Sequence, residues 1–292
     1  MKDPALDELV GRLTESSLNF PTSTQAALNV LDAINDPECG IASAARLVQL
    51  EPMLAAKAVA MSNTVPYNRS GRTITSVQEA LQLIGLQVLK MLAVNVDMGK
   101  MTANIRAAQR PVAAQLWDHS MQVGATAYAL ARRTMGPMAD AAMFAGTVHE
   151  LSGFYLLTRW PEAAGEDIAD VVATLLRRKA DDADAEQIVP LHPFAEQLGR
   201  PLLNAMRIPT PIIEAIQSTW YEDLNLPAET LGHILMLADV LAPTRSPFEG
   251  TLLMGRPLDH ELLESFVGKD ELEAVLAESQ ETIGSLLGAL RS

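Results

Sequence analysis

AGTVHELSG, residues 145–153, places two ionisable side chains, His149 and Glu150, among small and apolar residues. Small neighbours such as Gly146 lie within one helical turn of His149, so another backbone or side chain can approach it closely. The whole chain is poor in aromatic residues, at 4%, and rich in Ala and Leu, which favours helices over strands. The sequence therefore predicts an all-α fold in which a helix from Ala139 to about Thr158 carries this motif.

Two other apolar helices are predicted to carry an ionisable residue. The phrase LWDHS contains His119 within a helix expected from about Pro111 to Met135. The phrase ILMLADVLA contains Asp239 within a helix expected from Pro227 to about Leu241. An imidazole or a carboxylate is costly to bury unless it finds a partner. We therefore expect His119, His149 and Asp239 to meet in one interior network.

The charge balance excludes some classes of partner. The 292 residues contain 22 Lys and Arg against 36 Asp and Glu, which gives a formal net charge of -14 and a pI near 4.8. Such a surface repels phosphate backbones and anionic lipids, so we expect neither nucleic acid nor a membrane as a partner. The acidic start, MKDPALDELV, is unlike a signal peptide, and we expect a cytoplasmic protein. Cys39 is the single cysteine, which excludes an internal disulfide and a thiolate zinc cluster.

Caps and breakers divide the rest of the chain into short helices. The spacing of Ser76 and Glu79 fits a capping box, and Gly85 is expected to end the helix that follows. Residues 259–290 are expected to form two amphipathic helices that meet at Gly268, with their acids on a solvated face. The remaining helices are predicted at about 3–13, 22–34, 41–50, 52–62, 86–96, 161–179, 193–206 and 211–221.

Breaker residues mark 64–72 as a loop that carries Arg69 and Arg72. Arginine presents paired donors to phosphate groups, so these two side chains are candidates for a phosphate or small-molecule ligand contact. Exposed loops are more often simply solvated, and that interpretation is favoured. Trp117 and Trp220 are expected to anchor the core rather than to line a ligand pocket.

Several phrases, in the correct order, resemble the HDOD domains of bacterial signalling proteins. They are EPMLAAKAVAMSNT and RTITSVQEALQLIG, followed by LWDHS, AGTVHELSG and LADVLA. The resemblance covers residues 15–242 and implies an HD-like half, 108–242, with an N-terminal helical half, 15–100, packed against it. Residues 243–292 are then a C-terminal helical extension. HDOD domains are similar to the HD phosphohydrolases but generally lack their catalytic residues.

The sequence departs from the catalytic HD and HD-GYP pattern at several positions. The acid after the second histidine is Glu150 where the enzymes have Asp, and Phe154 stands where a lysine follows. Ala195 and Thr219-Trp220 occupy positions where further histidines complete a two-metal site. The resemblance therefore implies a degenerate site that lacks the ligands for two ions about 4 Å apart. The residues that remain are His119, His149, Glu150 and Asp239.

Two interpretations of this degenerate site stay open. In the favoured one, His149 bonds the buried Asp239, His119 completes the network, and the site holds no metal and no cofactor. In the other, these three residues and Glu150 hold a single metal ion.

The resemblance implies a non-catalytic signal-transduction protein that acts by binding a kinase, receiver, cyclase or transcription regulator. An acidic rim around apolar anchors is expected to select basic partners. The alternatives are a mononuclear metal-dependent HD phosphohydrolase acting on a nucleotide or cyclic dinucleotide, and a nucleotide sensor that binds without cleaving. Metal analysis and hydrolysis assays distinguish these functions.

Overall fold

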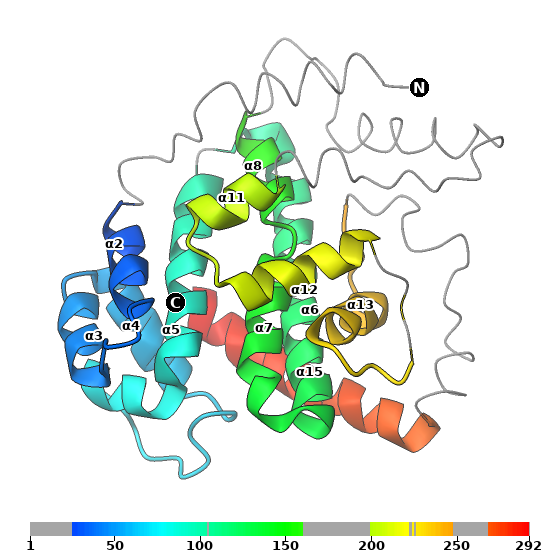
Figure 1. Ribbon diagram of the computed structural model, residues 1–292, viewed down its shortest axis with the longest axis horizontal. Helices are drawn as coiled ribbons and strands as arrows, with labels where there is room; N and C mark the ends of the chain where they lie inside the picture. The colour runs from blue at the N-terminus through cyan, green and yellow to red at the C-terminus, as the bar shows by residue number, and fades with distance from the viewer. Residues whose placement is uncertain are drawn as a thin grey trace.

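The computed structural model describes residues 25–103, 105–159, 199–221, 224, 226–247 and 268–291. These residues form helices and connecting turns without a strand, which confirms the all-α prediction (Figure 1). The helices predicted at 3–13 and 161–179, the first tail helix and Ala195 lie outside the described residues. The main helices are α2 Gln25–Ile34, α3 Ile41–Val48, α4 Pro52–Ser62, α5 Val77–Thr102, α6 Arg110–Thr134, α7 Ala139–Val148, α8 Leu151–Arg159, α11 Arg200–Ala205, α12 Thr210–Tyr221, α13 Leu231–Leu241 and α15 Lys269–Arg291.

Helix α6 is the central element, and it packs against α7, α13 and α15 (Figure 1). The backbones of α6 and α7 touch where they cross, because each helix has a glycine there. A Cβ atom on Gly146 would lie 2.6 Å from the Cα atom of Gly124. His119 precedes this crossing on α6 and His149 follows it after α7, so the crossing brings the two imidazole ring centres to 5.3 Å.

Helix α5 lies between two groups of helices. It packs against α2, α3 and α4 on one side and against α7 and α8 on the other (Figure 1). Gly85 interrupts α5 with φ 73° and ψ 174°, a conformation that favours glycine, as the sequence predicted. The helix then resumes and runs to Thr102, beyond the predicted end near residue 96.

The single helix predicted from Ala139 to Thr158 is wrong, because α7 and α8 are separated by His149 and Glu150. The His149 Nδ1 atom lies 2.7 Å from the Gly146 carbonyl oxygen, and this oxygen accepts a hydrogen bond from the ring. Helical hydrogen bonding starts again from the Glu150 carbonyl, which accepts from the backbone N–H groups of Gly153 and Phe154. His149 itself keeps a helical backbone conformation, with φ −61° and ψ −30°, and α8 begins two residues later.

Two helix starts also differ from the prediction. Among the described residues, no side-chain capping bond joins Ser76 and Glu79, because Glu79 pairs with Arg72 instead. Helix α13 begins at Leu231 and not at Pro227, because the Thr230 hydroxyl caps it by accepting from the His233 backbone N–H at 3.1 Å.

Helix α15 packs across α6 and α4. Its Leu272 and Val275 side chains are buried, and its Glu278 side chain is only 16% exposed. The Glu278 carboxylate pairs with Arg132 at 3.0 Å and with Arg133 at 3.2 Å. The prediction of a solvated acidic face is therefore wrong for Glu278, which ties the tail helix to α6.

By length and composition, residues Val77–Lys100 of α5 are apolar enough to cross a membrane. However, 67% of the most apolar window in this helix is buried inside the protein. This burial is typical of a core helix, and it agrees with the packing of α5 against helices on both of its sides.

Asp97 on α5 is a fully buried carboxylate, and the Lys100 ammonium lies 3.9 Å away. Burial raises the pKa of Asp97 from 3.8 to about 7. Between these values the folded state holds a proton that the unfolded state has lost, so stability falls as the pH rises through this window. We expect Asp97→Asn to increase the free energy of unfolding by about 1–2 kcal/mol at pH 8, after allowance for burying an amide. Urea denaturation at pH 5 and pH 8 measures this effect.

The matched control is Asp270→Asn, which changes an exposed aspartate on α15. The control should not alter the difference in stability between pH 5 and pH 8. An Asp97→Asn protein as pH-dependent as the wild type would contradict the prediction.

Candidate functional site

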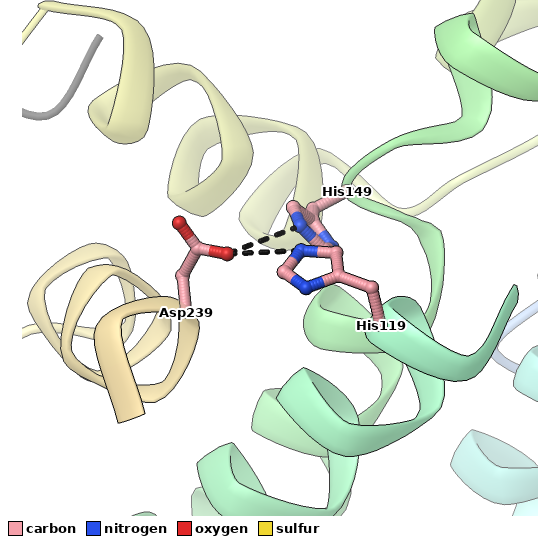
Figure 2. Close-up of side chains that lie close together, drawn as sticks. All are labelled: His119, His149 and Asp239. Atoms are coloured by element: carbon pink, nitrogen blue, oxygen red, sulfur yellow. Dashed lines mark ion pairs between the residues drawn. The ribbon is translucent and has the colours of Figure 1, made fainter. Parts of the chain in front are cut away.

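Three of the candidate residues come together from three parts of the chain. His119 comes from α6, His149 from the turn after α7, and Asp239 from α13 (Figure 2). The Nε2 atom of His119 lies 3.0 Å from Oδ1 of Asp239, and the Nε2 atom of His149 lies 3.8 Å from the same oxygen. We call His119, His149 and Asp239 the His-Asp cluster.

Each histidine of the cluster is anchored through its other ring nitrogen. The Nδ1 atom of His119 lies 2.8 Å from the Thr244 carbonyl oxygen, and that of His149 lies 2.7 Å from the Gly146 carbonyl oxygen. A carbonyl only accepts, so Nδ1 must carry the proton in both rings. Both Nε2 atoms are consequently directed at Asp239, as Figure 2 shows.

Burial and charge give the two histidines opposite protonation. Burial lowers the pKa of His119, but the hydrogen bond to Asp239 and the charges of Glu150 and Asp239 outweigh it and raise the pKa to about 9. Burial, together with the charge of His119, lowers the pKa of His149 to about 4. At neutral pH His119 is thus an imidazolium and His149 a neutral imidazole.

Glu150 takes a different position from the cluster. Its Oε1 atom accepts a hydrogen bond of 2.6 Å from the Ser246 hydroxyl. The ligand atoms of the His-Asp cluster all lie within 4.8 Å of one another. The Glu150 carboxylate is not part of that group. The Glu150 charge still acts on His119, because it contributes to the raised pKa of that residue.

The sequence analysis missed the segment that follows α13. Residues 243–246, which we call the strap, run along α6 beside the cluster. The Thr244 backbone N–H donates to Gln122 Oε1 at 2.6 Å, and Gln122 Nε2 donates to the Thr244 hydroxyl at 2.8 Å. Gln115 Nε2 donates to the Arg245 carbonyl at 2.9 Å. One sequence signal was available, because Gln115, His119 and Gln122 share a helical face.

Arg69 and Arg72 lie in the loop between α4 and α5, and both are exposed. Arg72 pairs with Glu79. The same loop contacts the start of α7, where the Tyr67 hydroxyl donates to Asp140 at 3.0 Å. His149 follows the other end of this helix, about 15 Å away for ten residues. The structure therefore does not bring the two arginines to the cluster.

At Phe154, Thr219 and Trp220, where the resemblance expects further polar groups, the side chains make packing contacts or bond their own helix. Phe154 is fully buried and meets Trp117 edge to face, with ring centres 6.0 Å apart. The Thr219 hydroxyl donates to the Ile216 carbonyl of its own helix at 2.6 Å. The Trp220 ring packs closely on Gly199. A Cβ atom added to Gly199 would lie 2.9 Å from the Trp220 ring.

A cavity of about 410 Å³ lies by the start of α6 and not at the cluster. None of the three cluster residues lines it. Its lining consists of Ala103, Ile105, Arg110, Ala113, Ala114, Trp117 and Phe154.

The cluster fits a single transition-metal ion by its donor types and spacing. Imidazole nitrogens and carboxylates suit first-row divalent ions, and histidine ligands usually donate their second ring N–H to a carbonyl or carboxylate, as both do here. Tetrahedral ligands about 2.1 Å from one ion are about 3.4 Å apart. The two Nε2–Oδ1 distances to Asp239, 3.0 and 3.8 Å, bracket this value, and all three ligand atoms lie within 4.8 Å of one another.

Comparison with known proteins gives a family-level match. The sequence model of the HDOD domain matches residues 20–221. Asp239 lies just beyond the matched segment. No curated protein matches the chain.

Several solved structures have a similar fold. A candidate metal-dependent phosphohydrolase from Shewanella amazonensis SB2B is 19% identical with a TM-score of 0.64, over 97% of this chain and 98% of that chain. An HDOD domain protein of unknown function from Geobacter sulfurreducens is 20% identical with a TM-score of 0.61, over 99% of both chains. A candidate signal transduction protein from Marinobacter aquaeolei VT8 is 17% identical with a TM-score of 0.61, over 98% of this chain and 65% of that chain. At these identities the similarity concerns the fold.

Proposed function

The chain belongs to the HDOD family, and on this premise we propose that it is a cytoplasmic regulatory protein of a bacterial signalling pathway. It acts by binding other proteins and not by hydrolysis. The fold shared with a candidate signal transduction protein supports the signalling context. The surface charge favours a partner with a basic face, which a kinase, receiver, cyclase or transcription regulator can offer.

One observation carries the non-hydrolytic part of the proposal. At Thr219 and Trp220, where the resemblance expects histidines for a second metal ion, one side chain bonds its own helix and the other packs on Gly199. Two-metal hydrolysis needs both ions to hold the attacking and leaving oxygens. Thr219 and Trp220 therefore provide no imidazole ligand for a second metal ion.

A hydrolysis screen tests this proposal directly. Full-length protein is incubated with nucleotides and cyclic dinucleotides in the presence of Mn²⁺, Mg²⁺ or Zn²⁺, beside His149→Ala as the control variant. We expect no difference in turnover between the two proteins, because the cluster lacks the groups for two-metal chemistry. Turnover by the wild type that is lost in His149→Ala would overturn the proposal. Thermal stabilisation by a nucleotide without product would instead favour a nucleotide sensor.

A second candidate function is favoured by the orientation of the two histidines. Both Nε2 atoms face one oxygen of Asp239 while both Nδ1 atoms are held by carbonyls, which is the arrangement of a metal site with three protein ligands. A bound divalent ion would supply Lewis acidity and lower the pKa of a water molecule on it. His119, His149 and Asp239 would hold the ion, and Glu150, held by Ser246, would lie beside it.

Zinc titration by calorimetry tests this second candidate. If the cluster binds Zn²⁺, one equivalent should bind to the wild type and none to His149→Ala, because that change removes one of three ligands. A ligand present at 100 times its Kd stabilises the protein by about 2.7 kcal/mol, so a rise in Tm should accompany binding. Asp270→Ala is the matched control on an exposed aspartate and should bind as the wild type does. Equal binding by the wild type and His149→Ala would exclude the cluster as the site.

A further inference from the structure

The strap and α6 are joined by a row of side chains at helical spacing. Gln115, His119 and Gln122 lie on one face of α6, and each bonds a strap residue. Thr244 is the centre of this row, because its N–H, its hydroxyl and its carbonyl are all engaged. Two of these groups contact Gln122, and the third accepts from His119.

This arrangement makes the position of His119 depend on Gln122. The Gln122 carboxamide holds Thr244 at two atoms, with contacts of 2.6 and 2.8 Å. The Thr244 carbonyl, fixed in this way, accepts from His119 Nδ1 at 2.8 Å. The His119 side chain is fully buried, so in this structure the Thr244 carbonyl is the acceptor on which its Nδ1–H depends.

Both partners of His119 lie close together in sequence. The Asp239 carboxylate accepts from the His119 Nε2 atom, and the Thr244 carbonyl accepts from the His119 Nδ1 atom. Asp239 and Thr244 are only five positions apart in the sequence. Two residues further on, the Ser246 hydroxyl holds Glu150 at 2.6 Å. A shift of this one segment would therefore alter the contacts of His119 and of Glu150 together.

We propose that the strap sets the geometry of the His-Asp cluster, with Gln122 as the positioning residue for His119 and Ser246 as the positioning residue for Glu150. Because Arg245 is exposed on the same segment, the strap also links the cluster to the protein surface. If a ligand at the cluster shifts the strap, a ligand or partner on the strap must affect the cluster by the same coupling free energy. This inference deepens the proposed regulatory function, since it names the segment through which the cluster is regulated.

The first test needs no metal and uses the full chain labelled with ¹⁵N-histidine. Buried and hydrogen-bonded imidazole N–H protons exchange slowly with water, so His119 and His149 should each give an observable Nδ1–H signal by NMR. The two signals are assigned by their loss in His119→Gln and His149→Gln. Gln122→Ala should lose the His119 signal and keep the His149 signal. Gln122→Glu, which retains an acceptor for the Thr244 N–H, should restore the His119 signal.

Gln115→Ala is the matched control, because Gln115 holds the neighbouring strap carbonyl but not Thr244. It should keep both signals. A His119 Nδ1–H signal that persists in Gln122→Ala would overturn the inference, whereas the Nε2–H signal, which depends on Asp239, does not decide it. Loss of both signals in Gln122→Ala, or loss of the His119 signal in Gln115→Ala, would show general loosening and would overturn it as well.

A second arm uses Zn²⁺ and rests on the single-metal candidate. Residues that orient a ligand typically contribute about 10- to 100-fold to metal affinity. Gln122→Ala should weaken Zn²⁺ binding by that factor, while Gln115→Ala should leave it unchanged. Absence of Zn²⁺ binding by the wild type would remove the metal candidate and leave the exchange test of the strap intact. Equal Zn²⁺ affinity of Gln122→Ala and the wild type would overturn the positioning role of Gln122.

Discussion

Replacing Asp239 with alanine is expected to lower the free energy of unfolding by about 3–5 kcal/mol, because it removes the carboxylate that pairs with the buried His119. His119 would lose its charge partner at 3.0 Å in a fully buried position. Urea denaturation at pH 7 measures the change. Asp270→Ala, on an exposed aspartate, should cost little. A loss below 1 kcal/mol in Asp239→Ala would contradict a structural role for the cluster.

The same variant should change how stability depends on pH. The pKa of His119 is raised from 6.5 to about 9, so its pairing contributes fully below pH 6.5 and is lost as the pH rises towards 9. The pKa of His149 is lowered to about 4, so its contribution is present above pH 6.5 and is lost as the pH falls towards 4. The combined contribution of the two histidines is therefore largest near pH 6.5. On the acid side it is opposed by Asp97, whose contribution grows as the pH falls from about 7 towards 3.8. Asp239→Ala should be flatter on the alkaline side, and an unchanged alkaline slope would argue against the pairing.

Gly146→Ala is expected to cost about 2–3 kcal/mol, since it inserts a methyl group between two touching backbones. The new Cβ atom would lie 2.6 Å from both Cα and N of Gly124, and a backbone cannot rotate away as a side chain can. The change should also disturb His149, because the Gly146 carbonyl accepts from its ring. Thermal and urea unfolding measure the loss.

The matched control for this prediction is Gly284→Ala on α15. Gly284 has no atom within 4 Å of a built Cβ and sits in a helix, so alanine should stabilise the protein there by about 0.5–1 kcal/mol. The two Gly→Ala substitutions should therefore change the free energy of unfolding in opposite directions. A similar effect at both positions would mean that the α6 and α7 backbones are not in contact.

Much of the fold was predictable because helix caps, breakers and apolar spacing are local properties of the sequence. The kink at Gly85 and the long α6 are examples, and their positions agree with the prediction. The break between α7 and α8 was not predictable from composition. At the break the His149 ring bonds the Gly146 carbonyl, and helix-forming residues on both sides conceal it.

The candidate site was predictable only as a set of residue types. His119, His149 and Asp239 stood out because ionisable groups on apolar helices require partners. Thr244 did not, because it acts through a backbone carbonyl that every residue has and contacts a histidine 125 positions away. Arg72 was chosen for its chemistry alone, and its pairing with Glu79 shows why residue type without position is a weak guide to binding.

The docking of α15 also has a consequence during synthesis of the protein. Arg133 and Glu278, which join α6 to α15, are 145 residues apart. At about 5–20 residues per second, a ribosome makes the second partner roughly 7–29 s after the first. For that interval the nascent chain presents an uncovered stripe of α6, together with two arginines that lack their carboxylate. A chaperone that recognises apolar segments with basic flanks would bind α6 during this interval, before α15 covers it.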